Sequence, residues 1–133
     1  MFNTPRCLVL LSIILMITSW CIPAYDDAKG YEVVYVSLFF HVFIIPIFIV
    51  FPVWANVTYC YSIFLFFKGD FKTKRWSYIT LAVMVYGLLS ISLNTKPVLA
   101  GAYLWVISGL ILCITNYIYT KAQNSKDTDS KFQ

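Results

Sequence analysis

The chain has 133 residues, of which 60% are hydrophobic and 12% are charged, with a formal net charge of +4. Soluble domains average about 45–50% apolar and about 25% charged residues, so a soluble core of this size would leave too much apolar surface in water. The basic residues flank apolar runs, where they act as topology signals, so we expect no nucleic-acid partner.

Charged residues are absent from four runs, which are residues 7–25, 33–67, 76–95 and 97–120. About 20 apolar residues span a bilayer, and a charge at the centre of a membrane helix costs about 2.5–3.5 kcal/mol. These runs predict an all-α fold, an integral membrane four-helix bundle that forms one transmembrane domain over residues 1–120. The lipid bilayer is its first expected partner.

The first run, residues 7–25, follows Arg6 and has the pattern of a signal peptide. Its exit is a poor cleavage site, because Ile22 stands two residues before Ala24, where a small residue is required. The bulky Trp20 precedes Cys21, which argues against a lipoprotein. We therefore expect residues 7–25 to be a retained first span.

The distribution of basic residues predicts the orientation. Eight basic residues lie on one predicted side: one before the first run, four in residues 68–75 and three in residues 121–133. The segments on the other side, residues 26–32 and 94–97, hold one basic residue each. Basic residues favour the cytoplasmic side, so both termini are expected in the cytoplasm of a bacterium, with the spans in its inner membrane.

The long run, residues 33–67, must then cross the membrane once, although a straight helix of that length would measure about 52 Å against a core of about 30 Å. Pro46 and Pro52 supply the break. We expect a short interfacial or re-entrant helix at residues 31–45 on the outer face, followed by a span at residues 47–67.

The third and fourth spans are predicted at residues 76–93 and 98–120. Residues 121–133 are polar, which is typical of a disordered cytoplasmic tail.

Small and polar residues recur at helical spacing on three of the predicted spans. These stripes are Ala55, Tyr59 and Ser62 beside Asn56; Thr80, Gly87, Ser90 and Asn94; and Gly101, Trp105, Ser108, Asn116 and Tyr119. Small residues let membrane helices approach, and hydroxyls and amides form bonds across the contact. The stripes indicate either packing seams or the lining of a site.

Four residues predicted at the same depth in the membrane form one candidate site. Trp54, Asn56, Tyr103 and Trp105 share one level in the outer half of the bundle, just below the proline break. Irregular backbone at membrane depth is tolerated where it is buried in protein or lines a cavity. We expect an outward-facing recognition pocket there, with His41 as its titratable neighbour; the alternative is an aromatic belt and an interhelical bond.

Chemical motifs are missing from the sequence. The four cysteines have no C-x-x-C spacing, and with a single histidine they do not resemble a zinc site. We find no nucleophile–base pair, no phosphate-binding glycine loop and no membrane-embedded glutamate. We therefore expect no catalytic residue, no metal and no cofactor.

Two short motifs in the sequence resemble motifs of a known group of proteins. The sequence GYE at residues 30–32, before an apolar segment, and Trp-Ala-Asn at residues 54–56 resemble a group of uncharacterised small bacterial four-span inner-membrane proteins. The resemblance implies the architecture and no activity.

Three functions agree with these features. The first is a membrane-embedded binding partner of a protein within the membrane or arriving from the outer side, such as an immunity protein against a membrane-active toxin. The second is an accessory or pore-forming subunit of a transport system, and the third is a holin-like lesion former. The sequence leaves the oligomeric state and the partner open.

Overall fold

The computed structural model describes residues 4–43, 51–92 and 97–130, which form five helices and one short hairpin. The first helix, α1, spans Thr4–Cys21. It ends at Cys21 because Pro23 has no amide hydrogen for a further helical bond and disfavours helical geometry in the preceding residue. The first predicted span therefore stops earlier than residue 25, and its last residues form a strand.

A two-stranded hairpin follows α1. Strand β1 (Pro23–Tyr25) pairs antiparallel with β2 (Ala28–Lys29). The turn places Asp26 at φ 54°, a left-handed conformation that aspartate tolerates better than most residues. This hairpin was not predicted from the sequence.

The segment before the last helix joins the free edge of β1. Three backbone contacts make this junction: the bridge between Tyr25 and Val98, the Asp26 amide bonded to the Pro97 carbonyl at 3.2 Å, and the Leu99 amide bonded to the Ala24 carbonyl at 3.0 Å. The two loops predicted on the outer side are therefore tied together at one end of the bundle, which we call the hairpin end.

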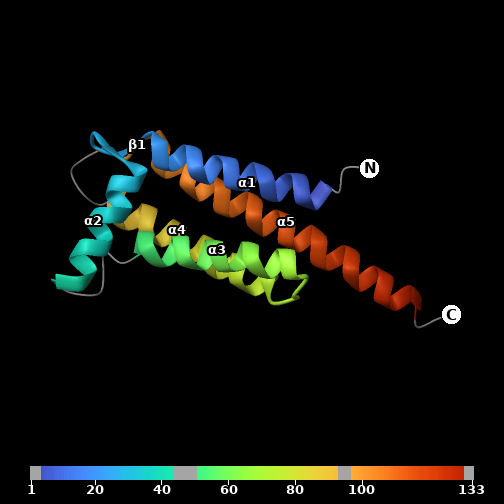
Figure 1. The fold of residues 1–133 in the computed structure, drawn as a ribbon. Helices are drawn as coiled ribbons and strands as arrows, with labels where there is room; N and C mark the ends of the chain where they lie inside the picture. Colours follow the sequence, from blue (N-terminus) through green and yellow to red (C-terminus); the bar gives the residue numbers. More distant parts are fainter. Residues whose placement is uncertain (1–3, 44–50, 93–96, 131–133) are drawn as a thin grey trace.

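Helix α2 (Gly30–Phe43) begins directly after the hairpin. The Glu32 carboxylate accepts a hydrogen bond from the Lys29 amide at 2.8 Å, which satisfies one of the free donors at the helix start. Figure 1 shows α2 running across the hairpin end instead of along the bundle. Residues 31–43 of the segment in which a short helix was expected are thus helical, and residues 44 and 45 lie outside the described residues.

Helices α3 (Phe51–Lys68) and α4 (Thr73–Ser92) form an antiparallel pair. Gly69 ends α3 at φ 77°, with its amide bonded to the Phe66 carbonyl and the Asp70 amide bonded to the Leu65 carbonyl. This is a Schellman motif, and it requires a left-handed residue that glycine supplies without strain. We call the end of the bundle with this turn the turn end.

Pro52 lies in the first turn of α3, where its missing amide hydrogen leaves no helical bond unmade. It therefore helps to start α3, and residues 47–50 of the predicted span at 47–67 lie outside the described residues. Pro46 lies outside the described residues.

Helix α5 spans Ala100–Ser130 and continues past Thr120, where we expected a disordered tail. No glycine or proline follows Thr120 in α5, and adding residues to an existing helix is easier than starting one. In Figure 1 this last part of α5 projects from the turn end.

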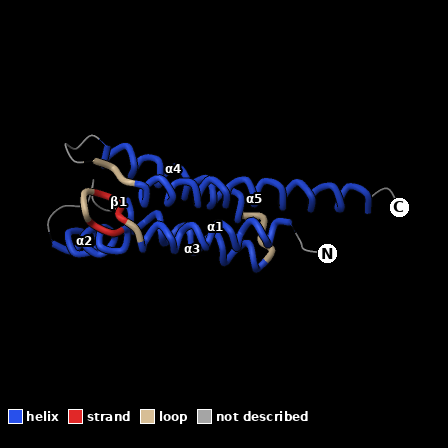
Figure 2. Tube along the Cα trace, turned by 90° about the horizontal axis from the view of Figure 1, so that it is seen from above, coloured by secondary structure: helices blue, strands red, loops and turns tan. Residues whose placement is uncertain are grey.

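Helix α5 packs against both α1 and α4, and α4 packs against α3. Figures 1 and 2 show these four helices running along a common direction, with α2 and the hairpin at one end and both termini toward the other. Buried residues from all four meet in one core; its members are Val9, Met16, Ala55, Tyr59, Phe66, Met84, Trp105 and Leu112.

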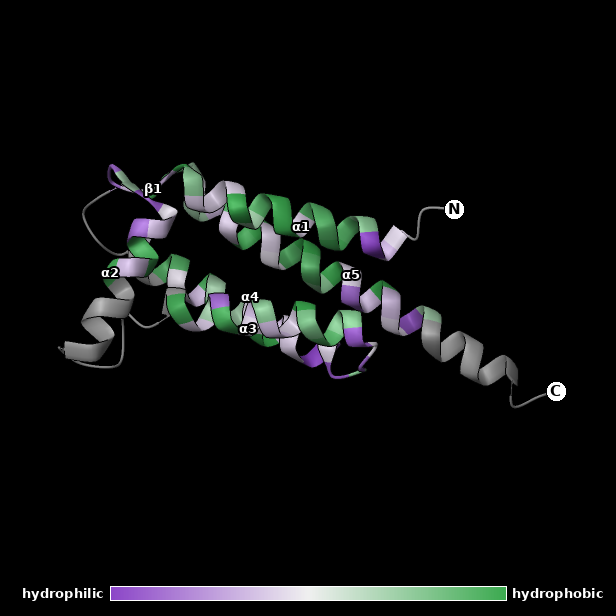
Figure 3. Cartoon of the chain, in the orientation of Figure 1, coloured by the Kyte–Doolittle hydropathy of each residue, from purple (hydrophilic) through white to green (hydrophobic). Residues whose placement is uncertain are grey.

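The all-α class predicted from composition is confirmed. By length and composition, α1 and residues Ala100–Ala122 of α5 are the described helices that could cross a membrane. Helix α3 carries Asn56 and ends at Lys68, and α4 begins with Lys74 and Arg75. Figure 3 shows apolar residues along much of the bundle, with polar ones gathered at its ends and in isolated positions.

Candidate functional site

Polar side chains gather inside the bundle. Seven residues form what we call the polar column: Ser12, Asn56, Tyr59, Ser62, Trp105, Ser108 and Asn116. They come from α1, α3 and α5, and each has less than a tenth of its surface exposed. On α3 and α5 they follow helical spacing, so each helix turns the same face inward along several turns.

The level nearest the hairpin end joins α5 to α3. The Trp105 indole Nε1 donates a hydrogen bond to the Asn56 side-chain Oδ1 at 3.1 Å. An indole nitrogen can only donate, so this bond fixes the orientation of the Asn56 amide and turns its Nδ2 donors away from Trp105. Nδ2 is buried without a hydrogen-bond partner among the described residues.

The middle level joins three helices. The Ser12 hydroxyl donates to the Ser108 carbonyl at 2.8 Å and lies 2.6 Å from the Tyr59 hydroxyl. A serine hydroxyl has one hydrogen, which Ser12 gives to Ser108, so Tyr59 is the donor in the second bond. The hydrogen bonds therefore run from α3 through α1 to α5.

The level nearest the turn end joins α5 to the α3–α4 pair. The Asn116 Nδ2 donates to the Ser62 hydroxyl at 3.3 Å, and Ser62 in turn donates to the Thr73 carbonyl at 3.4 Å. The Thr73 hydroxyl returns a bond to the Ser62 carbonyl at 3.0 Å. The Asn116 Oδ1 is buried without a hydrogen-bond partner within the described part of the chain.

The predicted recognition pocket is assembled only in part. Asn56 and Trp105 contact each other, as their shared depth suggested. Trp54 and Tyr103 are each 53% exposed, because they lie on the outward faces of α3 and α5. His41 belongs to α2, but its side chain lies outside the described residues.

The predicted stripes on α3 and α5 face the interior. Ala55, Tyr59 and Ser62 are buried on α3, as are Gly101, Trp105, Ser108 and Asn116 on α5. On α4, Thr80 and Gly87 are buried, whereas the side chain of Ser90 and the whole of Asn94 lie outside the described residues. The Thr80 hydroxyl bonds the Trp76 carbonyl of its own helix, so it does not reach the polar column.

The contribution of α1 to the buried polar residues was not predicted from the sequence. Its buried residues are Val9, Ser12, Met16 and Ser19, which follow the alternating three- and four-residue spacing of a helix packed along a seam. That spacing was present in the sequence, but the nearly uniform apolarity of α1 hid it.

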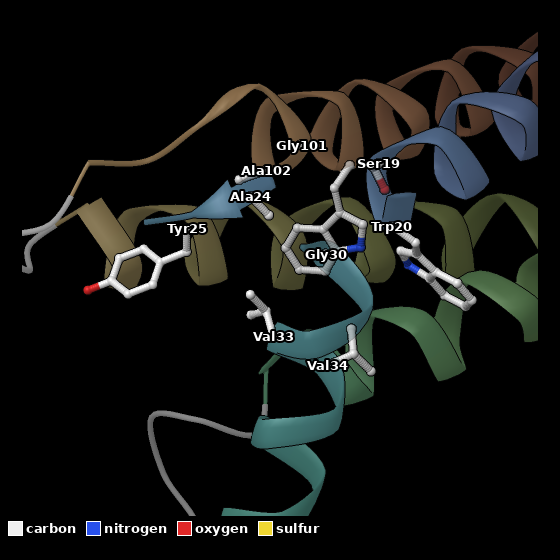
Figure 4. Close-up of a pocket in the computed structure, with 10 residues that line it drawn as sticks. Ser19, Trp20, Ala24, Tyr25, Gly30, Val33, Val34, Gly101 and Ala102 are labelled. Carbon is white, nitrogen blue, oxygen red and sulfur yellow. The ribbon is translucent and has the colours of Figure 1, made fainter. Parts of the chain in front are cut away.

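A cavity lies at the hairpin end, between the end of α1, the hairpin and the starts of α2 and α5. Its volume is about 30 Å³, room for one or two water molecules. Ten residues line it: Ser19, Trp20, Ala24, Tyr25, Gly30, Val33, Val34, Gly101, Ala102 and Trp105. The lining residues come from α1, β1, α2 and α5, and Figure 4 shows the Tyr25 hydroxyl turned away from the others.

Two glycines bring the backbones around this cavity together. A Cβ added at Gly30 would lie 2.3 Å from the Ser19 carbonyl oxygen, and one added at Gly101 would lie 2.7 Å from the Pro23 carbonyl oxygen. Real Cβ atoms do not approach backbone so closely, so α2 reaches α1, and α5 reaches the hairpin, only through glycine.

The side chains of the polar column and of the hairpin-end cavity are suited to recognition and packing. The polar column contains hydroxyls, amides and an indole, and the described residues hold no cluster of histidine, cysteine or acidic side chains arranged for a metal ion. The cysteines at positions 7, 21, 60 and 113 are free thiols. Uncharged donors and acceptors of this kind bind by hydrogen bonds and shape.

Comparison with known proteins finds no match to this chain. No protein-family model matches the sequence, and neither a curated protein nor a solved structure matches it. The resemblance to small bacterial four-span proteins therefore stays a prediction.

Proposed function

We propose that this chain is a non-enzymatic, four-span protein of the bacterial inner membrane that binds another protein at its hairpin end, on the outer side. The distribution of side chains supports the membrane placement. Large apolar residues are exposed on all four long helices, whereas eleven polar residues are buried in the part of the chain that the structure describes. A soluble protein of this size rarely exposes so much apolar surface, but lipid covers it without cost.

The arrangement of the basic segments supports the orientation. The start of α1 with Arg6, the basic turn between α3 and α4, and Lys121 of α5 lie toward the turn end (Figure 1). The hairpin end carries the acidic residues Asp26, Asp27 and Glu32. Positive-inside bias then puts the turn end in the cytoplasm and the hairpin end outside.

Helix α2 is the observation that carries the binding function. Its 14 residues include Glu32 and His41 as the side chains that can carry a charge near neutral pH, and most of the others are apolar or aromatic. A helix of that length measures about 21 Å and is too short to span a core of about 30 Å. Such a helix is stable only if something covers it, and among its described side chains Tyr31, Tyr35 and Val36 are exposed in the single chain.

The exposed side chains of α2 suit a protein partner. Tyr35 is 70% exposed and is flanked by exposed Tyr31 and Val36. Tyrosine is enriched in protein interfaces because it offers a large contact area and a hydrogen-bonding hydroxyl. The other face of α2, with Val33 and Val34, lines the cavity, so α2 is held in place while its outward face stays available.

The core argues for a binding partner over a pore within one chain. Val9, Met84 and Leu112 are fully buried in the same core as the polar column. Because these apolar side chains share the core with the hydrogen-bonded levels, a continuous polar path for an ion through the described interior of the single chain is disfavoured. An immunity protein against a membrane-active toxin is one form that the proposed binding function takes.

Photo-crosslinking in living cells tests the proposal. A benzoylphenylalanine is placed at position 35 in place of Tyr35, and in a second variant at position 78 in place of Tyr78, which is exposed on α4 near the turn end. We expect a discrete protein adduct from position 35 and none from position 78. Lipid adducts alone at position 35, or the same adduct from both positions, would refute binding at the hairpin end.

A further inference from the structure

The Trp20 indole is a buried donor that the fold leaves without an acceptor. Its Nε1 has no hydrogen-bond partner among the described residues, although Trp20 lines the hairpin-end cavity. Figure 4 shows the nitrogen edge of this indole turned toward the other lining residues. Leaving such a donor unpaired costs about 1–3 kcal/mol, so the site has a free-energy reason to take up an acceptor.

The lining of the cavity decides which acceptor fits. Apart from the two indoles, its side chains are those of alanine, glycine, valine, Tyr25 and Ser19, and none carries a charge. The Ser19 hydroxyl already donates to the Met16 carbonyl at 2.6 Å, and Trp105 donates to Asn56. A charged phosphate or carboxylate would lose its hydration here without a compensating cation, so a neutral acceptor is favoured.

A water molecule fits less well than a carbonyl oxygen. Water brings two hydrogens that need acceptors of their own, and the side chains that line the cavity offer only the hydroxyl oxygens of Ser19 and Tyr25. A carbonyl oxygen needs only donors, and one such group matches a volume of about 30 Å³. Backbone carbonyls of neighbouring membrane helices are already bonded within their helices, which leaves lipid as the abundant source.

We propose that the hairpin-end cavity holds the acyl ester carbonyl of a phospholipid, which accepts a hydrogen bond from the Trp20 indole Nε1. The inference rests on the proposed membrane placement, since Trp20 is the penultimate residue of α1 and so lies near the outer boundary of the bilayer core. Tryptophan favours this level because its ring is apolar and its N–H is polar. Val33 and Val34 provide an apolar wall for the attached acyl chain.

Ester and ether lipids separate this proposal from its alternatives. The full chain is placed in nanodiscs of diacyl phosphatidylglycerol or of the dialkyl ether analogue, which has the same headgroup and chain length but no carbonyl. The indole N–H signals are followed by ¹⁵N–¹H NMR, with the Trp20 signal assigned by Trp20→Phe. We expect Trp20 exchange with deuterium to be about fivefold slower in ester lipid, which corresponds to a hydrogen bond of about 1 kcal/mol.

Trp105 is the internal control, because its N–H is bonded to Asn56 within the protein and should be the same in both lipids. Equal Trp20 exchange in the two lipids would overturn the proposal and point to water or a protein acceptor. Parallel changes at Trp20 and Trp105 would also overturn it, because the lipid would then act on the whole bundle. Neither result bears on crosslinking from position 35, so the two proposals fail separately.

Discussion

The indole Nε1 of Trp105 donates to the side-chain Oδ1 of Asn56 across 3.1 Å, which joins α5 to α3 inside the bundle. Asn56 is only 8% exposed, and its other amide atom has no partner among the described residues. The pair therefore links two helices and still leaves donors unused on α3.

This pair predicts a measurable coupling. Asn56→Leu keeps a similar volume but leaves the Trp105 donor unpaired, and we expect a loss of about 1–2 kcal/mol in the free energy of unfolding in detergent. Trp105→Phe should destabilise too, and the double variant by less than the sum, with a coupling of about 0.6–1.7 kcal/mol. Strict additivity would show that the bond contributes nothing.

The middle level of the polar column predicts a contrast between two tyrosines on α3. Tyr59→Phe removes the donor to Ser12, and we expect a loss of about 0.5–1.5 kcal/mol in unfolding free energy. Tyr61→Phe is the matched control, because Tyr61 is exposed two residues away. Equal effects of the two substitutions would contradict the role given to the Tyr59 hydroxyl.

The surroundings of three glycines predict how strongly an alanine substitution at each one destabilises the protein. A Cβ at Gly30 or Gly101 meets backbone oxygen atoms, whereas one at Gly109 meets the Met84 sulfur at 2.4 Å. Backbone cannot move aside without disturbing the hairpin end, but methionine has three rotatable bonds. We expect Gly30→Ala and Gly101→Ala to lower the melting temperature more than Gly109→Ala, and the reverse order would contradict the close approach of these backbones.

The orientation predicts which positions an impermeant thiol reagent reaches from outside. In a variant with all four cysteines replaced by serine or alanine, Asp27→Cys should be labelled in intact cells. Lys72→Cys should be labelled only after the cells are permeabilised, because the turn end is expected in the cytoplasm. External labelling of position 72 would reverse the proposed topology, and labelling of neither position after permeabilisation would show that both are shielded.

The sequence by itself determined the class of the fold and the inward faces of two helices. Composition predicted helices throughout, because few charges interrupt the long apolar runs, and helical spacing identified the faces of α3 and α5 that carry Tyr59, Ser62, Ser108 and Asn116. These inferences hold because periodicity is local and each helix buries its small and polar stripe against its neighbours.

Only the tertiary structure decided which stripes meet and how the hairpin end is built. The bond between Trp105 and Asn56 joins residues 49 apart in the chain, so no local pattern distinguishes it from the exposed neighbours Trp54 and Tyr103. The pairing of β1 with residues 97–99 likewise depends on two loops brought together by the packing of α1 on α5. Tertiary packing also leaves the Trp20 indole N–H without an acceptor among the described residues. Long-range packing, and not the neighbouring residues in the chain, determines what surrounds a side chain.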